Sequence, residues 1–475
     1  MFTANASSHC DWFSMRPRLN GRTINWLGAI FGVSAFATLV AFGSPSKGNL
    51  KFTNTLLPPP PPDGDSEPEI SIAANGTMAM VGLSLGLASD MQFGTNLWTG
   101  PFGATPTFQG IIDGALQQPG KTVFGGEDAD VDFGSTGNLH MTTLIFLGNT
   151  TLTSGQLGVS AISCSNAASG FNSSNCIAQI IDKTQTDRPW ITSDGSHLWI
   201  SYHDSGNSTL IHIQRSDDDG LTFHRVGDPI VGQGGTTGSS TFDNDQGPIV
   251  ADSFTHNIYD IYAAGQGGLQ KAKTANFNNI FVSRSTDGGV TWTATLVFHA
   301  PVNVAQNNIF PTLAVDPTNG HLHAAWSDGH TVFYSTSSDQ GMTWSAAVAV
   351  NIAPANAAIF PWIAARNGTV NLVYYGTDGT GKDDPNAVWN VYLAQTMDNG
   401  ASFTQSLVSN APNHVGVICT EGAACPQPQI PGTRNLLDLF KVAIDPGSGK
   451  AAVIYTDDHS LGSFSLPQVV LAQQK

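Results

Sequence analysis

The feature that most constrains the fold of this chain is an octet that recurs four times with the pattern Ser/Thr-x-Asp-x-Gly-x-Thr/Ser-aromatic. The copies are SDDDGLTF at 216–223, STDGGVTW at 285–292, SSDQGMTW at 337–344 and TMDNGASF at 396–403. In such an octet the Asp accepts hydrogen bonds from amides of its own turn, and the Gly takes a positive φ. The aromatic residue then returns the chain to a core. Each octet is therefore predicted to be the turn of a β-hairpin.

A second repeat sets the size of the unit that contains each octet. Short apolar strands recur 50 to 79 residues apart, beginning at Pro68, Ala129, Pro189, Pro248, Pro311, Pro361 and Phe440. Each unit reads as strand, turn, strand, loop, strand, octet turn and strand, which is the pattern of a four-stranded propeller blade. We therefore predict an all-β propeller of seven blades over residues 67–475, with six blades as the alternative. A strand within residues 50–57 is expected to complete the last blade and close the ring.

Composition and charge agree with this fold and exclude some partners. Only four of the 36 acidic residues are Glu, a helix former, and the others are Asp, a turn former. The formal net charge is −17. A nucleic-acid partner needs clustered basic residues, so we expect neither nucleic acid nor an anionic membrane surface as partner. A monomer is expected.

The N-terminal residues 1–43 read as an export segment. Three arginines (Arg16, Arg18 and Arg22) precede an apolar run over residues 24–42. Such a run is either a signal peptide, cut here just after Gly43, or an uncleaved membrane anchor. In both cases the rest of the chain is extracytoplasmic, either secreted, periplasmic or at the cell surface. Residues 44–66 contain five consecutive prolines and form either a spacer or the ring-closing strand and its connection.

Four of the five cysteines form two pairs that are close in sequence. The pairs are Cys164 with Cys176 and Cys419 with Cys425. An even number of exported cysteines predicts disulfides, and local pairing is the simplest connectivity. The second pair lies in an insertion over residues 410–435, which is expected to overhang one mouth of the ring.

The first strands start, and the second strands end, at the same mouth of a propeller, because consecutive strands of a blade are antiparallel. The sequence places many carboxylates, with His, Tyr and Trp, at these positions. Candidate catalytic residues are Asp187, Arg188, Asp245, Tyr374, Arg434 and Asp457. Candidate substrate-binding residues are Trp190, His203, Asp204, Asp328, Tyr375 and His459.

Three interpretations of this acidic mouth stay open. The Asp residues are ordinary turn formers, or they bind Ca²⁺ through hard oxygen ligands, or two of them act as acid and base in glycoside hydrolysis. Asp128, Asp130 and Asp132 alternate along one strand and share a face, so they are the candidate metal ligands. No cofactor is expected to be required, with Ca²⁺ as the alternative.

The octets resemble the Asp boxes, or BNR repeats, of the sialidase-like propeller superfamily, and the resemblance covers about residues 67–475. It implies that the octets are structural turns away from the active site. Members include sialidases, other glycosidases and non-catalytic binding propellers. Asp187-Arg188-Pro189-Trp190 loosely resembles the Arg-Ile-Pro segment of sialidases, so the resemblance implies Arg188 and Arg434 as substrate-binding arginines.

The sequence departs from the sialidase pattern at two points. A third arginine is missing at the mouth, because Arg215 and Arg284 directly precede octets and belong to the opposite face. The tyrosines Tyr374, Tyr375 and Tyr455 are candidate nucleophiles, but no Glu lies near them in sequence. We therefore expect a glycan- or glycoprotein-directed propeller that acts as a glycoside hydrolase of another specificity. A non-catalytic carbohydrate- or protein-binding propeller is the alternative.

Overall fold

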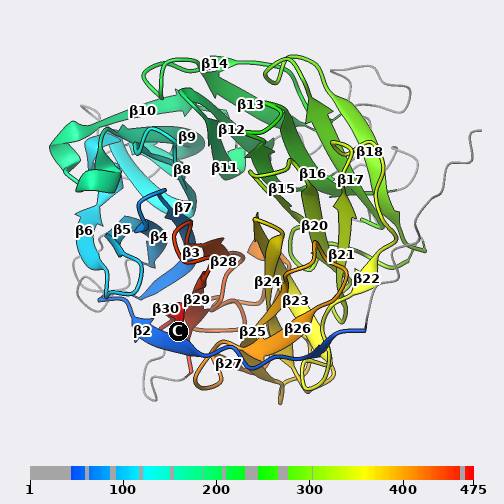
Figure 1. Cartoon of the computed structure of the whole chain (residues 1–475). Helices are drawn as coiled ribbons and strands as arrows, with labels where there is room; N and C mark the ends of the chain where they lie inside the picture. The colour runs from blue at the N-terminus through cyan, green and yellow to red at the C-terminus, as the bar shows by residue number, and fades with distance from the viewer. Residues whose placement is uncertain are drawn as a thin grey trace, which may run out of the picture. The chain divides into compact units, whose positions relative to one another are not determined.

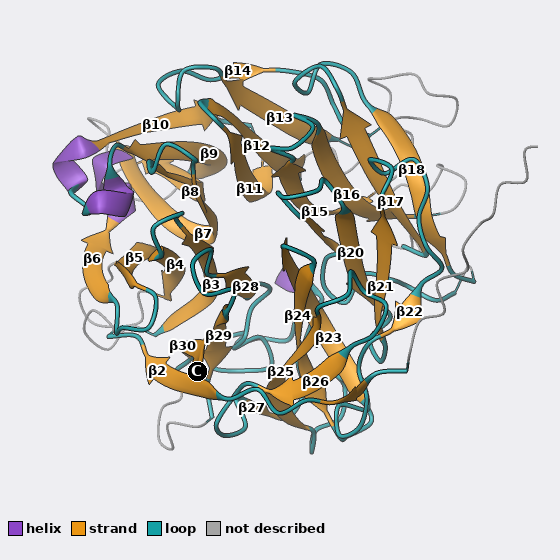
Figure 2. Ribbon diagram, in the orientation of Figure 1, coloured by secondary structure: helices purple, strands orange, loops and turns teal. Residues whose placement is uncertain are grey.

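The computed structural model forms a ring of seven β-sheets (Figure 1). The described residues are 44–58, 64–85, 93–116, 121–149, 154–184, 186–205, 210–230, 244–265, 277–301, 303–459 and 466–475. Residues 1–43, on which the predicted signal or anchor falls, lie outside them. Strands make up the blades, and the helices of the described residues are short 3₁₀ turns (Figure 2). In the same part of the chain, no helix is long and apolar enough to cross a membrane.

The first four blades follow one another along the chain. Blade 1 contains β3 (Asp65–Ile72), β4 (Thr77–Leu85), β5 (Phe93–Pro101) and β6 (Thr107–Ile111). Blade 2 contains β7 (Lys121–Phe133), β8 (Leu139–Asn149), β9 (Gly155–Cys164) and β10 (Cys176–Asp182). Blade 3 contains β11 (Thr186–Asp194), β12 (His197–Asp204), β13 (Ile211–Ser216) and β14 (His224–Arg225). Blade 4 contains β15 (Asn244–Ala251), β16 (Ile258–Ala264), β17 (Asn279–Ser285) and β18 (Thr293–His299).

The last three blades include strands from the N-terminal part of the chain. Blade 5 contains β19 (Thr312–Val315), β20 (Leu322–Ser327), β21 (Val332–Ser337) and β22 (Val348–Ala349). Blade 6 contains β23 (Ala357–Arg366), β24 (Thr369–Thr377), β25 (Val388–Thr396) and β26 (Thr404–Leu407), with β1 (Ser46–Lys47) and β27 (His414–Val415) added. Blade 7 contains β28 (Lys441–Ile444), β29 (Ala451–Asp457), β30 (Gln468–Gln474) and β2 (Phe52–Leu56). The short helices are η1 (Ile112–Leu116), η2 (Ala167–Ser169), η3 (Ser173–Asn175) and η4 (Gly422–Ala424).

The N-terminal strand closes the ring, as the sequence predicts. β2 pairs antiparallel with β30 and is the outer strand of blade 7, so the two ends of the chain share one sheet. The prediction of seven four-stranded blades is confirmed, and the six-bladed alternative is wrong. The prolines follow β2 in sequence, so their segment connects blade 7 to blade 1 and does not precede the propeller.

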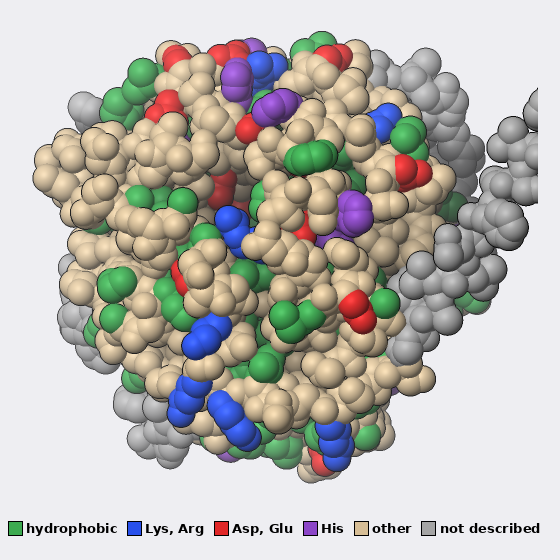
Figure 3. Space-filling view, in the orientation of Figure 1, with side chains coloured by type: hydrophobic (Ala, Val, Ile, Leu, Met, Phe, Trp, Pro, Cys, Tyr) green, Lys and Arg blue, Asp and Glu red, His purple; other side chains and the backbone are tan. Residues whose placement is uncertain are grey.

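The first strand of each blade lies at the centre of the ring. Contacts between neighbouring first strands run all the way round, from β3 through β7, β11, β15, β19, β23 and β28 back to β3. The space-filling view in the same orientation shows charged side chains of both signs around this centre (Figure 3). Large aromatic side chains, Trp98, Trp326 and Trp389 among them, are fully buried between the sheets. The hydrophobic core therefore lies between the blades and continues across the axis, where the Trp190 ring of blade 3 lies 5.2 Å from the Trp362 ring of blade 6.

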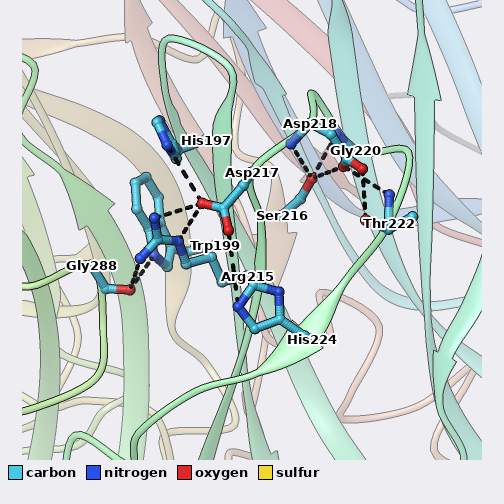
Figure 4. A network of polar contacts seen from close by, with 10 residues as sticks. All are labelled: His197, Trp199, Arg215, Ser216, Asp217, Asp218, Gly220, Thr222, His224 and Gly288. Atoms are coloured by element: carbon cyan, nitrogen blue, oxygen red, sulfur yellow. Dashed lines mark hydrogen bonds and ion pairs between the residues drawn. The ribbon is translucent and has the colours of Figure 1, made fainter.

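The four octets fold into the same turn. In blade 3, the Gly220 amide donates to Ser216 Oγ at 2.9 Å, and the amide and hydroxyl of Thr222 donate to Asp218 at 2.8 and 2.6 Å (Figure 4). The other three octets form the same bonds at the equivalent positions. The hairpin prediction from sequence is confirmed, including the positive φ of the glycine.

Each octet also contacts the blade that precedes it. Trp199 Nε1 donates to the carbonyl of Gly288 at 3.0 Å, and Arg284 Nη1 donates to that of Gln340 at 3.2 Å. The Tyr334 hydroxyl donates to the carbonyl of Asn399 at 3.4 Å. Gln179 Nε2 makes the equivalent bond to the octet of blade 3 at 2.9 Å. The octet thus fastens one blade to the next as well as turning the chain.

Replacement of an octet Asp should therefore destabilise the ring. Asp287→Ala removes the acceptor of the Val290 and Thr291 amides and of the Thr291 hydroxyl. We expect a loss of about 1–2 kcal/mol in the free energy of unfolding, because a net hydrogen bond contributes about 1 kcal/mol. Urea unfolding measures it. The matched control is Asp383→Ala, whose side chain is 84% exposed and pairs with Lys382, and it should leave the unfolding midpoint unchanged.

Candidate active site at the mouth of the ring

A cavity of about 1150 Å³ opens at one mouth of the ring. The starts of the first strands supply most of its polar lining: Glu67, Asp128, Asp187, Arg188, Asn244, Asp245, Asn307 and Asp438. The segment between blades 6 and 7 covers one side with Thr420, Glu421, Gly422, Gln427, Gln429, Ile430 and Arg434. The octets lie at the other ends of the blades. The sequence prediction that this mouth is acidic, and that the insertion overhangs it, is confirmed.

The backbone is bent where the first strands meet the cavity. A non-glycine residue with φ between 28° and 56° stands there in six blades: Glu67, Asp128, Arg188, Phe310, Phe360 and Leu437. The pairing register shifts at the same place in β3, β7, β11 and β23. A bulge of this kind re-aims a side chain, and a left-handed residue costs about 1–2 kcal/mol. All of these residues except Phe360 line the cavity, so the strain is concentrated at the mouth.

Arg188 is held by carboxylates on two sides. Its Nη1 donates to Asp245 Oδ1 at 2.6 Å, and its Nε lies 4.0 Å from Asp187 Oδ2. The guanidinium carbon lies 4.7 Å from the centre of the Phe310 ring. Asn307 Nδ2 donates to the second oxygen of Asp245 at 3.0 Å. Burial raises the pKa of Asp245, and the charge of Arg188 opposes that rise.

A second guanidinium is paired across the cavity wall. Arg434 Nη2 donates to Asp438 Oδ2 at 2.6 Å, and Arg434 Nη1 donates to Gln429 Oε1 at 3.4 Å. The Asp438 amide donates to Glu67 Oε1 at 3.1 Å, which links blade 7 to blade 1. Burial raises the pKa of Asp438, while the charge of Arg434 lowers it. Both arginines that line the cavity are therefore already paired with carboxylates of the chain.

Asp128 differs from the other carboxyls of the mouth. Its side chain lines the cavity, yet the residue is only 8% exposed. Within the described residues it forms no hydrogen bond or ion pair. Burial raises the pKa of Asp128 well above its ordinary range, and the charges of Glu67, Asp187 and Asp438 raise it further. Asp128 therefore keeps a proton where a solvated Asp would have lost it.

Beneath the cavity lies a buried charge cluster that the sequence analysis missed. Lys441 Nζ lies 2.9 Å from Glu69 Oε2 and 2.6 Å from Asp130 Oδ1, and 5.1 Å from the centre of a Trp362 ring. The second oxygen of Asp130 accepts the Ile191 amide at 2.9 Å. Burial raises the pKa of Glu69 to about 8, although Lys441 opposes the rise. The only signal in the sequence is that Glu69 lies two residues beyond Glu67 on the same first strand.

Both predicted disulfides are present. Cys164 pairs with Cys176 across β9 and β10, and Cys419 pairs with Cys425 in the overhanging segment. The second disulfide flanks Glu421 and Gly422, which line the cavity. It therefore holds one wall of the mouth in place.

Removal of that disulfide should weaken the binding of a ligand in the cavity. For the double variant Cys419→Ser and Cys425→Ser, we expect a several-fold higher Kd for such a ligand, because the wall is loosened while the carboxyls on the first strands stay in place. Isothermal titration calorimetry with an oligosaccharide measures this. The matched double variant Cys164→Ser and Cys176→Ser lies in blade 2, away from the cavity lining, and should leave the Kd unchanged.

The structure divides the predicted catalytic residues into two groups. Asp187, Arg188, Asp245 and Arg434 meet at the cavity. Tyr374 does not line it: this side chain is fully buried, and its hydroxyl donates to Gln405 Oε1 at 2.6 Å. Asp457 is 1% exposed, does not line the cavity either, and accepts the amide of His459 at 3.0 Å. Both lie at ends of second strands, which packing between blades keeps away from the axis.

The predicted substrate-binding residues also lie outside the lining of the cavity. Trp190 is 1% exposed, with its ring 5.2 Å from that of Trp362, and Tyr375 stacks on Phe440 at 4.3 Å. These aromatic side chains fill the core.

The polar members of that set bond within their own part of the ring. Asp204 pairs with His212 at 2.9 Å, and Asp328 accepts the amides of His330 and Thr331. His203 is 6% exposed and faces Asp187 across the strand pair, while His459 is exposed. None of these residues reaches the cavity wall.

The three alternating aspartates have separate surroundings. Asp128 faces the cavity, Asp130 pairs with Lys441, and Asp132 accepts the Ser193 hydroxyl at 2.6 Å. Burial raises the pKa of Asp132 to about 6. Among the described residues, no three His, Cys, Asp or Glu side chains are grouped so that they could hold a metal ion.

Comparisons with known proteins give similarity of structure alone. No protein-family model matches the sequence, and no curated protein matches it. Similar solved structures include the Penicillium chrysogenum α-L-arabinanase complexed with arabinobiose, at 11% identity over 90% of this chain and 98% of that chain, with a TM-score of 0.43. An ulvan lyase matches at 11% identity over 91% and 94%, with a TM-score of 0.47. The intramolecular trans-sialidase of Ruminococcus gnavus matches at 10% identity over 86% and 94%, with a TM-score of 0.42. At this similarity, function has to be inferred from the cavity itself.

Proposed function

We propose that this protein hydrolyses uncharged glycans in the cavity at the mouth of the ring, with Asp128 as general acid and Asp187 as the partner carboxylate. The observation that carries the proposal is the contrast between these two carboxyls. Asp128 is buried at the cavity wall with a raised pKa, whereas the Asp187 side chain is 41% exposed beside the Arg188 guanidinium. Two carboxyls in opposite environments are what glycoside hydrolysis requires.

The reaction follows from these environments. Asp128 gives its proton to the glycosidic oxygen while the bond from that oxygen to the anomeric carbon breaks. Asp187 takes a proton from a water molecule, and the resulting hydroxide forms the new bond to the anomeric carbon. The Arg188 guanidinium lies beside Asp187, with its Nε 4.0 Å from Asp187 Oδ2. After the products leave, Asp187 releases its proton to solvent and Asp128 regains one. The proton count is balanced over one turnover.

The charge of the cavity selects the substrate class. Six carboxyls line it (Glu67, Asp128, Asp187, Asp245, Glu421 and Asp438) against two guanidiniums. Each guanidinium already pairs with a carboxylate of the chain at 2.6 Å, so the positive charge of both is partly offset before a substrate enters. Anionic sugars such as sialic acid or uronic acids would add charge that this cavity repels.

We place this activity outside the cytoplasm. The two disulfides support this placement, because cytosolic proteins rarely keep structural disulfides. The apolar run over residues 24–42 supports it independently.

A panel of fluorogenic glycosides tests the proposal with the whole chain. The panel contains uncharged hexosides and pentosides, including an arabinofuranoside, together with a sialoside and a glucuronide. We expect turnover of at least one uncharged member and none of the anionic ones. Asp187→Asn and Arg188→Ala should abolish the turnover. Turnover that survives both substitutions would place the chemistry elsewhere.

A non-catalytic glycan-binding propeller is the second candidate. The overhanging wall and the large polar cavity favour it equally, because both suit a bound oligosaccharide. A panel without any turnover, combined with binding of an uncharged oligosaccharide in a glycan array, would establish this second function.

A further inference from the structure

The cavity at the mouth of the ring has an apolar wall on blade 2. Leu144 and Phe146 stand two residues apart on β8, so their side chains point to the same face of the sheet. Leu157 on β9 pairs directly with Phe146. All three residues line the cavity; Leu144 is 2% exposed, and Phe146 and Leu157 are half-buried. We call these three residues the apolar wall.

Packing between the blades does not explain the apolar wall. The opposite face of β8 carries Ile145 and Leu147, which are buried in the core that blades 1 and 2 share. Among the described residues, the hydrophobic clusters between the blades include none of the three wall residues. Phe146 and Leu157 present part of their surface to the cavity instead. Apolar lining next to a few convergent polar groups is typical of a ligand pocket.

The apolar wall lies beside the carboxyl that we propose as general acid. In the pairing of β7 with β8, Leu144 is opposite Glu127, the residue that directly precedes Asp128. β7 is the innermost strand of blade 2, and β8 and β9 follow it outward. The other cavity carboxyls on first strands surround the axis. The cavity therefore has a polar part at the axis and an apolar part over blade 2, with Asp128 between them.

This arrangement restricts the chemistry of the leaving group. A general acid protonates the oxygen of the leaving group, so that group lies on the side of Asp128. The hydroxyls of a second sugar would meet no polar partner on the apolar wall, which is unfavourable, whereas an apolar group would bury surface there. We propose that the apolar wall binds the leaving group, and that the substrate is an uncharged sugar joined to an apolar alcohol or phenol. This inference rests on the proposed hydrolysis.

Hexyl and methyl glycosides of the sugar that the fluorogenic panel identifies test the proposal with the whole chain. Both leaving groups are simple alcohols of similar acidity, so the two substrates differ in binding rather than in chemistry. A buried methylene improves binding about fourfold, so burial of about two of them should make KM at least about tenfold lower for the hexyl glycoside. Phe146→Ala and Leu157→Ala should each reduce this ratio severalfold.

The matched control is Leu296→Ala, because Leu296 is 50% exposed on β18 and does not line the cavity. It should leave the ratio of the two KM values unchanged. Equal KM values for the hexyl and methyl glycosides, or a ratio that both wall substitutions leave intact, would overturn the proposal while the hydrolysis itself stands. Urea unfolding shows whether each variant is folded, and Leu157→Ala decides if Phe146→Ala is not.

Binding of 2-naphthol separates this proposal from the proposed hydrolysis, because it needs no turnover. We expect isothermal titration calorimetry to show binding to the wild type and a Kd at least about fivefold higher in the wall variants. If the panel shows no turnover, the hydrolysis fails, and this Kd still decides whether the apolar wall binds an apolar group. A Kd for 2-naphthol that neither wall substitution changes overturns the apolar site even in an active glycosidase.

Discussion

Asp128→Asn is expected to lower kcat for an uncharged glycoside by about 10²–10⁴-fold, which is the usual contribution of a general acid. The asparagine amide has the size of the carboxyl but has no acidic proton to give to the leaving oxygen. KM should change little, because the shape of the cavity wall is preserved. Steady-state kinetics on the best member of the glycoside panel measure both constants.

The pH profile of the wild type should carry the signature of the same residue. Because the pKa of Asp128 is raised, kcat is expected to fall as pH rises through that raised pKa and Asp128 loses its proton. In Asp128→Asn the residual activity should lack this limb. An Asp128→Asn enzyme with normal kcat would remove Asp128 from the mechanism, even if the panel shows hydrolysis.

The stability of Asp128→Asn separates loss of chemistry from loss of fold. A carboxyl whose pKa is raised on folding stabilises the folded state at low pH, and this contribution is lost as pH rises through the folded pKa. The asparagine variant does not place a buried charge at the mouth at any pH. We therefore expect it to be at least as stable as the wild type at pH 8, as measured by urea unfolding. A strongly destabilised variant would make its lost activity a folding effect.

Lys441→Met is expected to destabilise the protein by about 3–5 kcal/mol, which is the typical cost of leaving a buried charge without its partner. Lys441 is the cation between Glu69 and Asp130, which are 0 and 3% exposed. Without it, two carboxyls face each other at the centre of the ring. The free energy of urea unfolding measures this loss of stability, which does not depend on any enzymatic activity of the protein.

The destabilisation should grow with pH. Glu69 has a pKa raised to about 8 from 4.5, so its protonated form favours the folded state, and this stability is lost as pH rises from about 4.5 through 8. At pH 5 the variant can hold a proton on Glu69, whereas at pH 8 the Glu69 carboxylate repels that of Asp130. A Lys441→Met penalty that is equal at both pH values would contradict the charge cluster.

Two further variants make the Lys441 result specific. Lys382→Met removes a lysine that pairs with the highly exposed Asp383, and it should change stability by less than about 0.5 kcal/mol. Addition of Glu69→Gln and Asp130→Asn to Lys441→Met removes the stranded carboxylates and should restore part of the loss. If the triple variant is no more stable than Lys441→Met, the loss comes from packing around Trp362 and not from charge.

Local turn chemistry explains why the fold could be predicted from the sequence. Each octet contains its own hydrogen-bond partners, such as Asp287 with the amide and hydroxyl of Thr291, and needs nothing from distant residues to form. The sequence contains seven strand repeats, and the last repeat has only three strands. A strand from the N-terminal part of the chain, such as β2, is therefore needed to complete the seventh blade and close the ring. The acidic mouth follows from the same topology. The first strands of all blades run in the same direction, so Asp187 and Asp245, which stand at the starts of their strands, lie at the same mouth.

The tertiary structure alone decided which of the mouth residues reach the cavity. Tyr374, Tyr375 and Trp190 have a sequence context like that of site residues, but packing between blades places them in the core. The bulge at the start of the first strands, which aims Glu67, Asp128 and Arg188 inward, depends on pairing with the neighbouring strand.

The sequence by itself determined the repeat, the blade, the ring and the sign of the charge at its mouth, because these depend on contacts that are local or repeated along the chain. The partners of each charge depend on residues far apart in sequence, such as Lys441 with Glu69 and Arg188 with Asp245. Burial and those partners set which carboxyl keeps its proton. Only the closed ring could therefore distinguish Asp128 from the other aspartates of the chain.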